Sequence, residues 1–185
     1  MFGKSKKASY SGKDCYKQVE KLLTSGKRLL IISPYIDAYY ADFLLHNSEG
    51  RDIHVISSSL EGNAKKILNS NRNRRNFQGF SFSFVLLSIG FFLLNLAQVS
   101  ELALLVAFII IVYSFTQKSA SIRLRVPKKF VHAKMYISEA MAIHGSANLT
   151  YKGLHENIEH IDVVDDIGEV KALEEQFWSL WNSEV

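Results

Sequence analysis

The sequence contains little of the two residue types that most often constrain a chain covalently. It has one cysteine, Cys15, and two prolines in 185 residues. A single cysteine excludes an internal disulfide and agrees with a reducing compartment. Residues 1–7 carry lysines with no apolar run behind them, so no secretory signal is expected. Internal repeats and low-complexity tracts are also missing, which favours an ordinary globular domain.

Charge is missing from the middle of the chain. No Asp, Glu, Lys or Arg lies between Arg75 and Glu101, and a second uncharged run covers residues 102–117. Residues 77–96 have about the 20-residue length that crosses a bilayer. The second run, about 16 residues at about 1.5 Å each, reaches only about 24 Å and is the weaker span.

These runs predict a transmembrane helical hairpin over 76–117, with spans at about 77–96 and 102–117. Basic residues precede the first run at 72–75 and follow the second at 118–125, so the positive-inside rule places both ends on the cytoplasmic side. The prediction is a multi-pass membrane protein with two spans and a cytoplasmic catalytic domain. The alternative is a buried helical pair, but two helices that are apolar all round would overfill a small domain.

The clearest chemical pattern lies in 130–137 and 145–150. If residues 131–138 form a strand, His132, Lys134 and Tyr136 share one face, and Ser146 and Asn148 alternate in the same way. An imidazole, an ammonium, a hydroxyl and an amide suit a phosphodiester, because phosphoryl transfer needs a nucleophile and donors for the non-bridging oxygens. The alternative for any one of these residues is an ordinary solvated strand face.

Together the motifs resemble the signature of the phospholipase D superfamily, whose core is His-x-Lys-x4-Asp followed by Gly-Ser-x-Asn. The matching residues are His132-x-Lys134, Glu139, Gly145-Ser146-x-Asn148 and Asn157-x-Glu159, and 29–37 resembles the first core strand and turn of that family. The sequence departs from the pattern at Glu139, where the family has aspartate. That position is mostly structural in the family, so we expect adjusted packing there.

The resemblance implies a covalent phosphohistidine and a set of site residues. His132 is the nucleophile or general acid, Lys134, Asn148 and Ser146 bind the substrate phosphate, and Glu159 orients His132. The family needs two motifs at one site and this sequence has one His-x-Lys, so the resemblance implies a homodimer that shares one active site. It implies no metal and no cofactor. The spacing of His144, His155 and His160 also lacks a metal-ligand pattern.

The fold class predicted is α/β: a phospholipase D-like sheet sandwiched by helices, with the hairpin inserted between its N-terminal half, 1–75, and its catalytic half, 118–185. Helices are expected near 14–25, 38–45, 62–69 and 168–181, and strands near 28–33, 52–58, 121–125, 131–138, 142–146 and 159–164.

The leading function is a membrane-anchored phospholipase D-type phosphodiesterase (a hydrolase) that hydrolyses or transfers phospholipid headgroups, so its partners would be membrane lipid and a second copy of itself. The alternative function is a membrane-tethered endonuclease, which would use the same phosphodiester chemistry on DNA or RNA. The basic N-terminal half suits anionic lipid and nucleic acid equally. A non-catalytic membrane scaffold is the third option, and intact motif residues argue against it.

Overall fold

A computed structural model describes residues 7–12, 15–70 and 121–183. Residues 1–69 and 120–185 belong to one compact unit. Its elements are strand β1 (Lys7–Ser11), helix α1 (Cys15–Thr24), strands β2 (Arg28–Ile32) and β3 (Tyr35–Ile36), helix α2 (Ala38–His46), strands β4 (Asp52–Ile56), β5 (Ser59–Leu60), β6 (Ser121–Arg125), β7 (Met135–Ser138) and β8 (Ala142–Gly145), the π-helix η2 (Lys152–Glu156), strand β9 (His160–Val164) and helix α5 (Ile167–Asn182).

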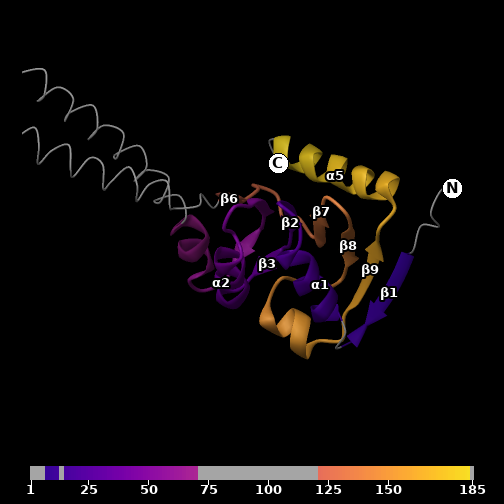
Figure 1. Cartoon of the computed structure of the whole chain (residues 1–185). Helices are drawn as coiled ribbons and strands as arrows, with labels where there is room; N and C mark the ends of the chain where they lie inside the picture. The colour runs from indigo at the N-terminus through magenta and orange to yellow at the C-terminus, as the bar shows by residue number, and fades with distance from the viewer. Residues whose placement is uncertain (1–6, 13–14, 71–120, 184–185) are drawn as a thin grey trace, which may run out of the picture. The chain divides into compact units, whose positions relative to one another are not determined.

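A mixed seven-stranded sheet forms the centre of this unit, in the order β1-β9-β8-β7-β2-β4-β6. Strand β2 pairs in parallel with β4 and antiparallel with β7, and β4 pairs in parallel with β6. The other pairs, β7 with β8, β8 with β9 and β9 with β1, are antiparallel. Helix α1 lies across one side of the sheet, whereas α5 runs along the other side (Figure 1).

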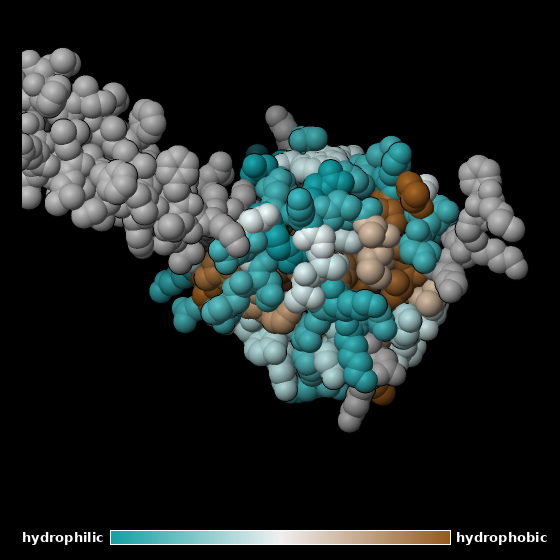
Figure 2. Space-filling model, viewed as in Figure 1, coloured by the Kyte–Doolittle hydropathy of each residue, from teal (hydrophilic) through white to brown (hydrophobic). Residues whose placement is uncertain are grey.

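Apolar side chains of the central strands fill a core on each face of the sheet. In β2, Leu29 and Ile31 join the cluster formed with α1 and α2, whereas Leu30 and Ile32 join the cluster under α5. All four are buried, as expected for a strand that is covered on both faces. The predicted α/β sheet between helices is confirmed. Figure 2 shows mostly hydrophilic residues on one face of this unit, with an apolar group beside β8 and β9.

Helix α5 packs on the sheet through an aromatic contact with a buried histidine. The ring of His54 in β4 lies 5.0 Å from the rings of both Trp178 and Trp181, and Arg123 Nη1 lies 2.8 Å from His54 Nε2. Burial lowers the pKa of His54, and the positive charge of Arg123 adds to this effect, while Asp52 opposes it. His54 is therefore a neutral acceptor for the Arg123 guanidinium.

Three features of the elements differ from the expectations. Strand β7 begins at Met135, four residues later than predicted, so His132 and Lys134 lie in irregular chain before it. Tyr136 does not share an exposed face with them, because it is buried in the cluster under α1. Strands β1, β3 and β5 and the helix η2 were not predicted, since short or edge elements carry weak periodic signals.

The predicted membrane localisation requires correction. Within 7–12, 15–70 and 121–183, no helix combines the length and apolar character needed to span a bilayer. The longest described helix, α5, has 16 residues and carries Glu169, Glu174 and Glu175, which would be costly to place in hydrocarbon. The predicted hairpin at 76–117 falls outside the described residues. The prediction of a multi-pass membrane protein is therefore wrong for the described unit, because its helices are too short or too polar to span a bilayer.

Candidate active site

The predicted site residues converge on one edge of the sheet. Strands β2 and β8 end at this edge, and β7 and β9 begin there, because β7 and β9 run antiparallel to β2 and β8 respectively. Lys134 therefore precedes β7, Ser146 follows β8 and Glu159 precedes β9. Three successive segments of the chain thus place polar side chains at the same end of neighbouring strands.

The segment that carries His132 is held at both ends by hydrogen bonds. The backbone N–H of Val131 donates to Ser58 Oγ at 2.8 Å, and Gly145 N donates to the carbonyl oxygen of Lys134 at 3.3 Å. Within the segment, Lys134 Nζ donates to the carbonyl oxygen of His132 at 2.9 Å. The imidazole itself is exposed, so this irregular segment presents His132 to solvent from a fixed backbone.

Glu159 and Ser146 form a second part of the site. Ser146 Oγ donates to Glu159 Oε2, and Asn157 Nδ2 donates to Glu159 Oε1 at 3.1 Å. The backbones are tied together as well, because Ser146 N donates to His160 O at 2.9 Å and His160 N donates to Ser146 Oγ at 3.0 Å. Glu159 is thus fixed by two side chains, and no hydrogen bond joins it to the His132 ring within the described part of a single chain.

Gly145 allows the strands that carry these residues to approach closely. A methyl group on Gly145 would overlap the carbonyl oxygen of His160 and lie 2.8 Å from Cα of Ile161. Real Cβ atoms do not approach other atoms so closely, so any side chain here would push β9 away from β8. The glycine of the Gly-Ser-x-Asn motif therefore sets the distance between Ser146 and Glu159.

Asn148 lies in a loop that the core holds from beneath. The backbone N–H of Leu149 donates to Ser33 Oγ at 2.9 Å, and the Tyr136 hydroxyl donates to the carbonyl oxygen of Ala147 at 2.9 Å. Burial raises the pKa of Tyr136, so it remains a neutral donor. Among the described residues, the buried Oδ1 of Asn148 has no hydrogen-bond partner. The fold positions this amide without using its carbonyl oxygen.

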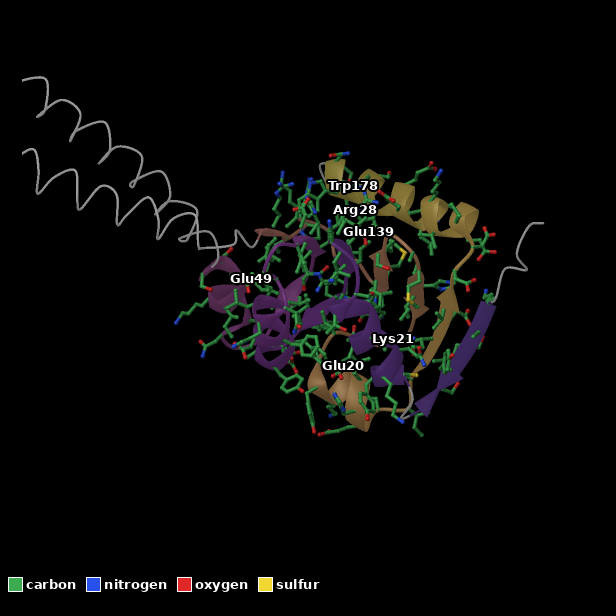
Figure 3. The ribbon with its side chains drawn as sticks, viewed as in Figure 1. Glu20, Lys21, Arg28, Glu49, Glu139 and Trp178 are labelled. Atoms are coloured by element: carbon green, nitrogen blue, oxygen red, sulfur yellow. The ribbon has the colours of Figure 1, made fainter. Side chains whose placement is uncertain are left out.

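Glu139 is not part of this cluster. It follows the far end of β7, where its Oε1 accepts the backbone N–H groups of Lys27 at 3.0 Å and Arg28 at 2.6 Å. Figure 3 shows it grouped with Arg28 and Trp178 beside α5. Burial by itself would raise the pKa of Glu139, but these backbone hydrogen bonds outweigh it and the pKa is lowered. Its position, where the family has aspartate, fixes the start of β2.

Two pairs of exposed aromatic rings belong to the segments around the site, and the sequence did not predict them. One pair packs beside His132, and the other includes Tyr151, which follows Asn148 by three positions. Phe130 packs against His132, with 4.7 Å between ring centroids, and against Tyr35 at 5.7 Å. Tyr39 and Tyr151 form the second pair at 5.2 Å. Phe130 is 48% exposed and Tyr151 is 45% exposed. In the sequence, Phe130 and Tyr151 are marked only by their positions near His132 and Asn148, and such positions do not indicate whether a side chain is exposed.

The other histidines have local partners. His155 is packed between Tyr16 and Tyr151, with 4.5 Å to each ring centroid, and its Nε2 lies 3.0 Å from the Tyr40 hydroxyl. His160 Nδ1 lies 2.9 Å from Ser11 Oγ. His144 lies opposite Asp162 in the β8–β9 pair.

Comparisons with known proteins agree with this architecture. The family model described as cardiolipin synthase, PLD-like domain, matches residues 19–181. Nuc from Salmonella typhimurium, a phospholipase D family member, superposes with a TM-score of 0.58 at 14% identity, covering 97% of this chain and 95% of Nuc. NucT from Helicobacter pylori gives 0.57 at 13% identity, covering 97% of this chain and 98% of NucT.

A phosphatidylserine synthase from Haemophilus influenzae Rd KW20 gives a TM-score of 0.51 at 13% identity, covering 96% of this chain but 39% of that protein. These low identities establish a shared fold and not a shared substrate. A sequence search among curated proteins found no match. The family model covers nearly the whole described unit, including the segments that carry His132, Ser146 and Glu159. The chain therefore belongs to the phospholipase D-like family.

Proposed function

We propose that this protein is a phosphodiesterase that cleaves nucleic-acid strands through a phosphohistidine formed on His132, in a site completed by a second copy of the chain. Family membership supports phosphodiester chemistry. The choice of substrate rests on one observation: exposed aromatic rings lie in the segments that carry the site residues. Phe130 and Tyr35 pack beside His132, and Tyr39 packs on Tyr151, which follows Asn148 by three positions.

The proposed reaction is the one that the family resemblance implies for His132. A ring nitrogen of His132 attacks phosphorus and forms the N–P bond, while the bond from phosphorus to the leaving oxygen breaks. His132 of the partner subunit gives its proton to that oxygen. It then takes a proton from water as the water oxygen attacks phosphorus, and the N–P bond breaks to release the phosphate product. Each His132 is thus restored.

The remaining polar residues stabilise the charge on the phosphate oxygens. Lys134 supplies an ammonium and Asn148 supplies an amide donor. The Ser146 hydroxyl donates to Glu159 in one chain, so it binds a phosphate oxygen only if it turns away from that carboxylate. Glu159 orients an imidazole so that one nitrogen attacks while the other is held by an acceptor. Glu159 has no hydrogen bond to the His132 ring within one described chain, so we assign this orienting contact to the assembled two-copy site.

A nucleic-acid strand fits the aromatic pairs because every base offers a face for stacking. Stacking of a base on an aromatic side chain contributes about 1–3 kcal/mol. Lys128 and Lys129 are exposed directly before Phe130, so cations that can pair with backbone phosphates adjoin one aromatic pair. A phospholipid headgroup has no base that could stack on these rings.

A phospholipid headgroup remains the second candidate substrate. The matching family model is itself described as cardiolipin synthase, PLD-like domain, which favours a lipid phosphodiester. In this case the exposed rings would not affect turnover of a headgroup. The two candidates therefore predict different results for the same substitutions.

The test compares labelled single-stranded DNA or RNA, a labelled phospholipid and a small chromogenic phosphodiester on the full chain. We expect turnover of the strand, with His132→Ala reducing kcat at least 10³-fold on every substrate that is cleaved. His46→Ala is the matched control, because His46 is exposed at the end of α2 and bonds only within that helix. Turnover of phospholipid alone would refute the nucleic-acid proposal, and full activity of His132→Ala would refute the mechanism.

The aromatic residues are tested on two substrates at once. Combining Phe130→Ala with Tyr35→Ala should lower kcat/KM for a strand about 10- to 100-fold, the kinetic equivalent of about 1–3 kcal/mol. Turnover of the small phosphodiester should change less than about threefold. Equal losses on both substrates would mean that the rings support the site and do not bind bases.

The shared site is tested by mixing. If His132→Ala chains exchange freely with wild-type chains and each active dimer needs two intact histidines, activity should follow the square of the wild-type fraction. A linear dependence would show that each chain works alone.

A further inference from the structure

Ile158 is the most exposed large apolar side chain among the described residues, at 91%. It lies between Asn157 and Glu159, the two residues whose side chains are joined by a 3.1 Å hydrogen bond in the candidate site. Isolated exposed apolar residues are common on proteins, so exposure alone assigns no role. The position of Ile158 inside the site segment is what separates it from the others.

The backbone on both sides of Ile158 is fixed. Asn157 N donates to Lys152 O at 2.9 Å, and the carbonyl oxygen of Glu159 accepts from Gly12 N at 2.9 Å and from Cys15 Sγ at 3.4 Å. Contacts from η2 and from the N-terminal segment therefore prevent the chain from turning Ile158 inward. The side chain is displayed outward by a structured loop.

The proposed function requires a contact surface between two copies close to the site. One chain supplies one His132 and one Lys134, so the two copies must meet face to face around the site. A two-fold interface uses the same patch on both chains, and homodimer interfaces are more apolar than the rest of the protein surface. An isoleucine offers no hydrogen bond to a phosphate and no ring to a base, so it suits an apolar partner surface better than the substrate.

We propose that Ile158 anchors the interface between two copies of this chain and thereby brings the two His132 residues into one site. The proposal rests on the proposed two-copy function and adds the surface through which the copies meet. Ile158 becomes buried against the partner on dimer formation, next to the loop that fixes Glu159. The interface and the site are therefore assembled by the same segment.

The experiment compares Ile158→Asp with Ile167→Asp in the full chain. Ile167 is the second most exposed of these residues, at 74%, and begins α5 beyond the other end of β9. Both substitutions replace an exposed isoleucine with the same charge, so neither should disturb the fold, and circular dichroism checks this. Association is measured by sedimentation velocity over a range of chain concentrations, and activity on the small phosphodiester is measured over the same range.

We expect wild type and Ile167→Asp to be dimers with equal activity. Ile158→Asp should raise the dissociation constant at least 100-fold and lose activity in proportion to the dimer fraction, with recovery at high concentration. A dimeric and fully active Ile158→Asp chain would overturn the proposal, as would a monomeric wild type. A wild-type dimer that dissociates on Ile158→Asp but cleaves no phosphodiester would instead refute the proposed function and leave this interface supported.

Discussion

Gly145→Ala tests whether the close approach of β8 and β9 builds the site. The added methyl group would overlap the carbonyl oxygen of His160 and lie 2.8 Å from Cα of Ile161, and both are backbone atoms that no rotamer change can move. Strand β9 must therefore shift by about 1 Å. Overpacking of this kind costs about 1–3 kcal/mol.

The shift also affects hydrogen bonds that cross the two strands. The bonds from Ser146 N to His160 O and from His160 N to Ser146 Oγ contribute about 1 kcal/mol each. Gly145→Ala is therefore expected to lower the free energy of unfolding by about 3–5 kcal/mol. A displacement of about 1 Å between Ser146 and Glu159 should reduce kcat about 100-fold in the protein that remains folded.

The assay is urea unfolding at a fixed chain concentration, with kcat on a small phosphodiester measured well below the unfolding midpoint. Gly50→Ala is the control, because Gly50 has φ +69° but open space around its Cα. It should lose about 1–2 kcal/mol through backbone strain and keep its activity. A Gly145→Ala protein no less stable than Gly50→Ala, with unchanged kcat, would refute the inferred role of the close approach.

Four further predictions concern Glu139, His54 and the removal of metal ions. Glu139→Ala should lower the free energy of unfolding by about 1–2 kcal/mol, a value reduced for solvent screening, while kcat stays within about twofold; a large loss of kcat with little loss of stability would contradict its remote placement. Because the folded-state pKa of Glu139 is lowered, its contribution is complete above its unfolded pKa of about 4.3 and is lost as pH falls through the folded value; urea titrations of wild type and Glu139→Gln at several pH values would measure this. The pKa of His54 is also lowered in the folded chain, so as pH falls the unfolded chain binds a proton on this residue before the folded chain does. The free energy of unfolding should therefore decrease below about pH 6.5, by at most about 1.4 kcal/mol per pH unit. His54→Gln should reduce this pH dependence, and an unchanged pH dependence would contradict a buried neutral imidazole. Finally, an excess of EDTA should leave phosphodiesterase activity within about twofold, and its abolition would contradict histidine-based catalysis without a metal.

The sequence predicted the elements whose pattern is repeated over several residues. Strand β2 could be found because it is a continuous apolar run, and α5 because Val170 and Phe177 recur at helical spacing; both are buried as expected. The site residues could be grouped because the family motif has fixed spacing. The structure places Lys134, Ser146 and Glu159 at one sheet edge, while their catalytic roles remain predictions.

The rest depended on contacts between distant segments. Nothing near His132 in sequence indicates that β7 begins only at Met135, since the alternation of polar and apolar residues continues through 131–134. The contacts of the Glu159 carbonyl oxygen could not be foreseen either, because Gly12 and Cys15 lie in the N-terminal segment. Exposure of Ile158 and Phe130 follows from the completed surface, which periodicity does not encode.

The pairing of β1 with β9 affects when, during synthesis and folding, the loop that carries Glu159 can form. Strand β1 is made before the other described strands, whereas its partner β9 and the Glu159 carbonyl that accepts from Gly12 N are made after the other strands of the sheet. Ser11 and His160 are separated by 149 positions, so at about 5–20 residues per second a ribosome needs roughly 7–30 s between them. Because loop closure over such a separation must precede the contact, the site loop should be the last part of the unit to become protected during folding. Pulse-labelled hydrogen exchange on refolding chains would show β2 and β4 protected before the backbone of Glu159 and His160.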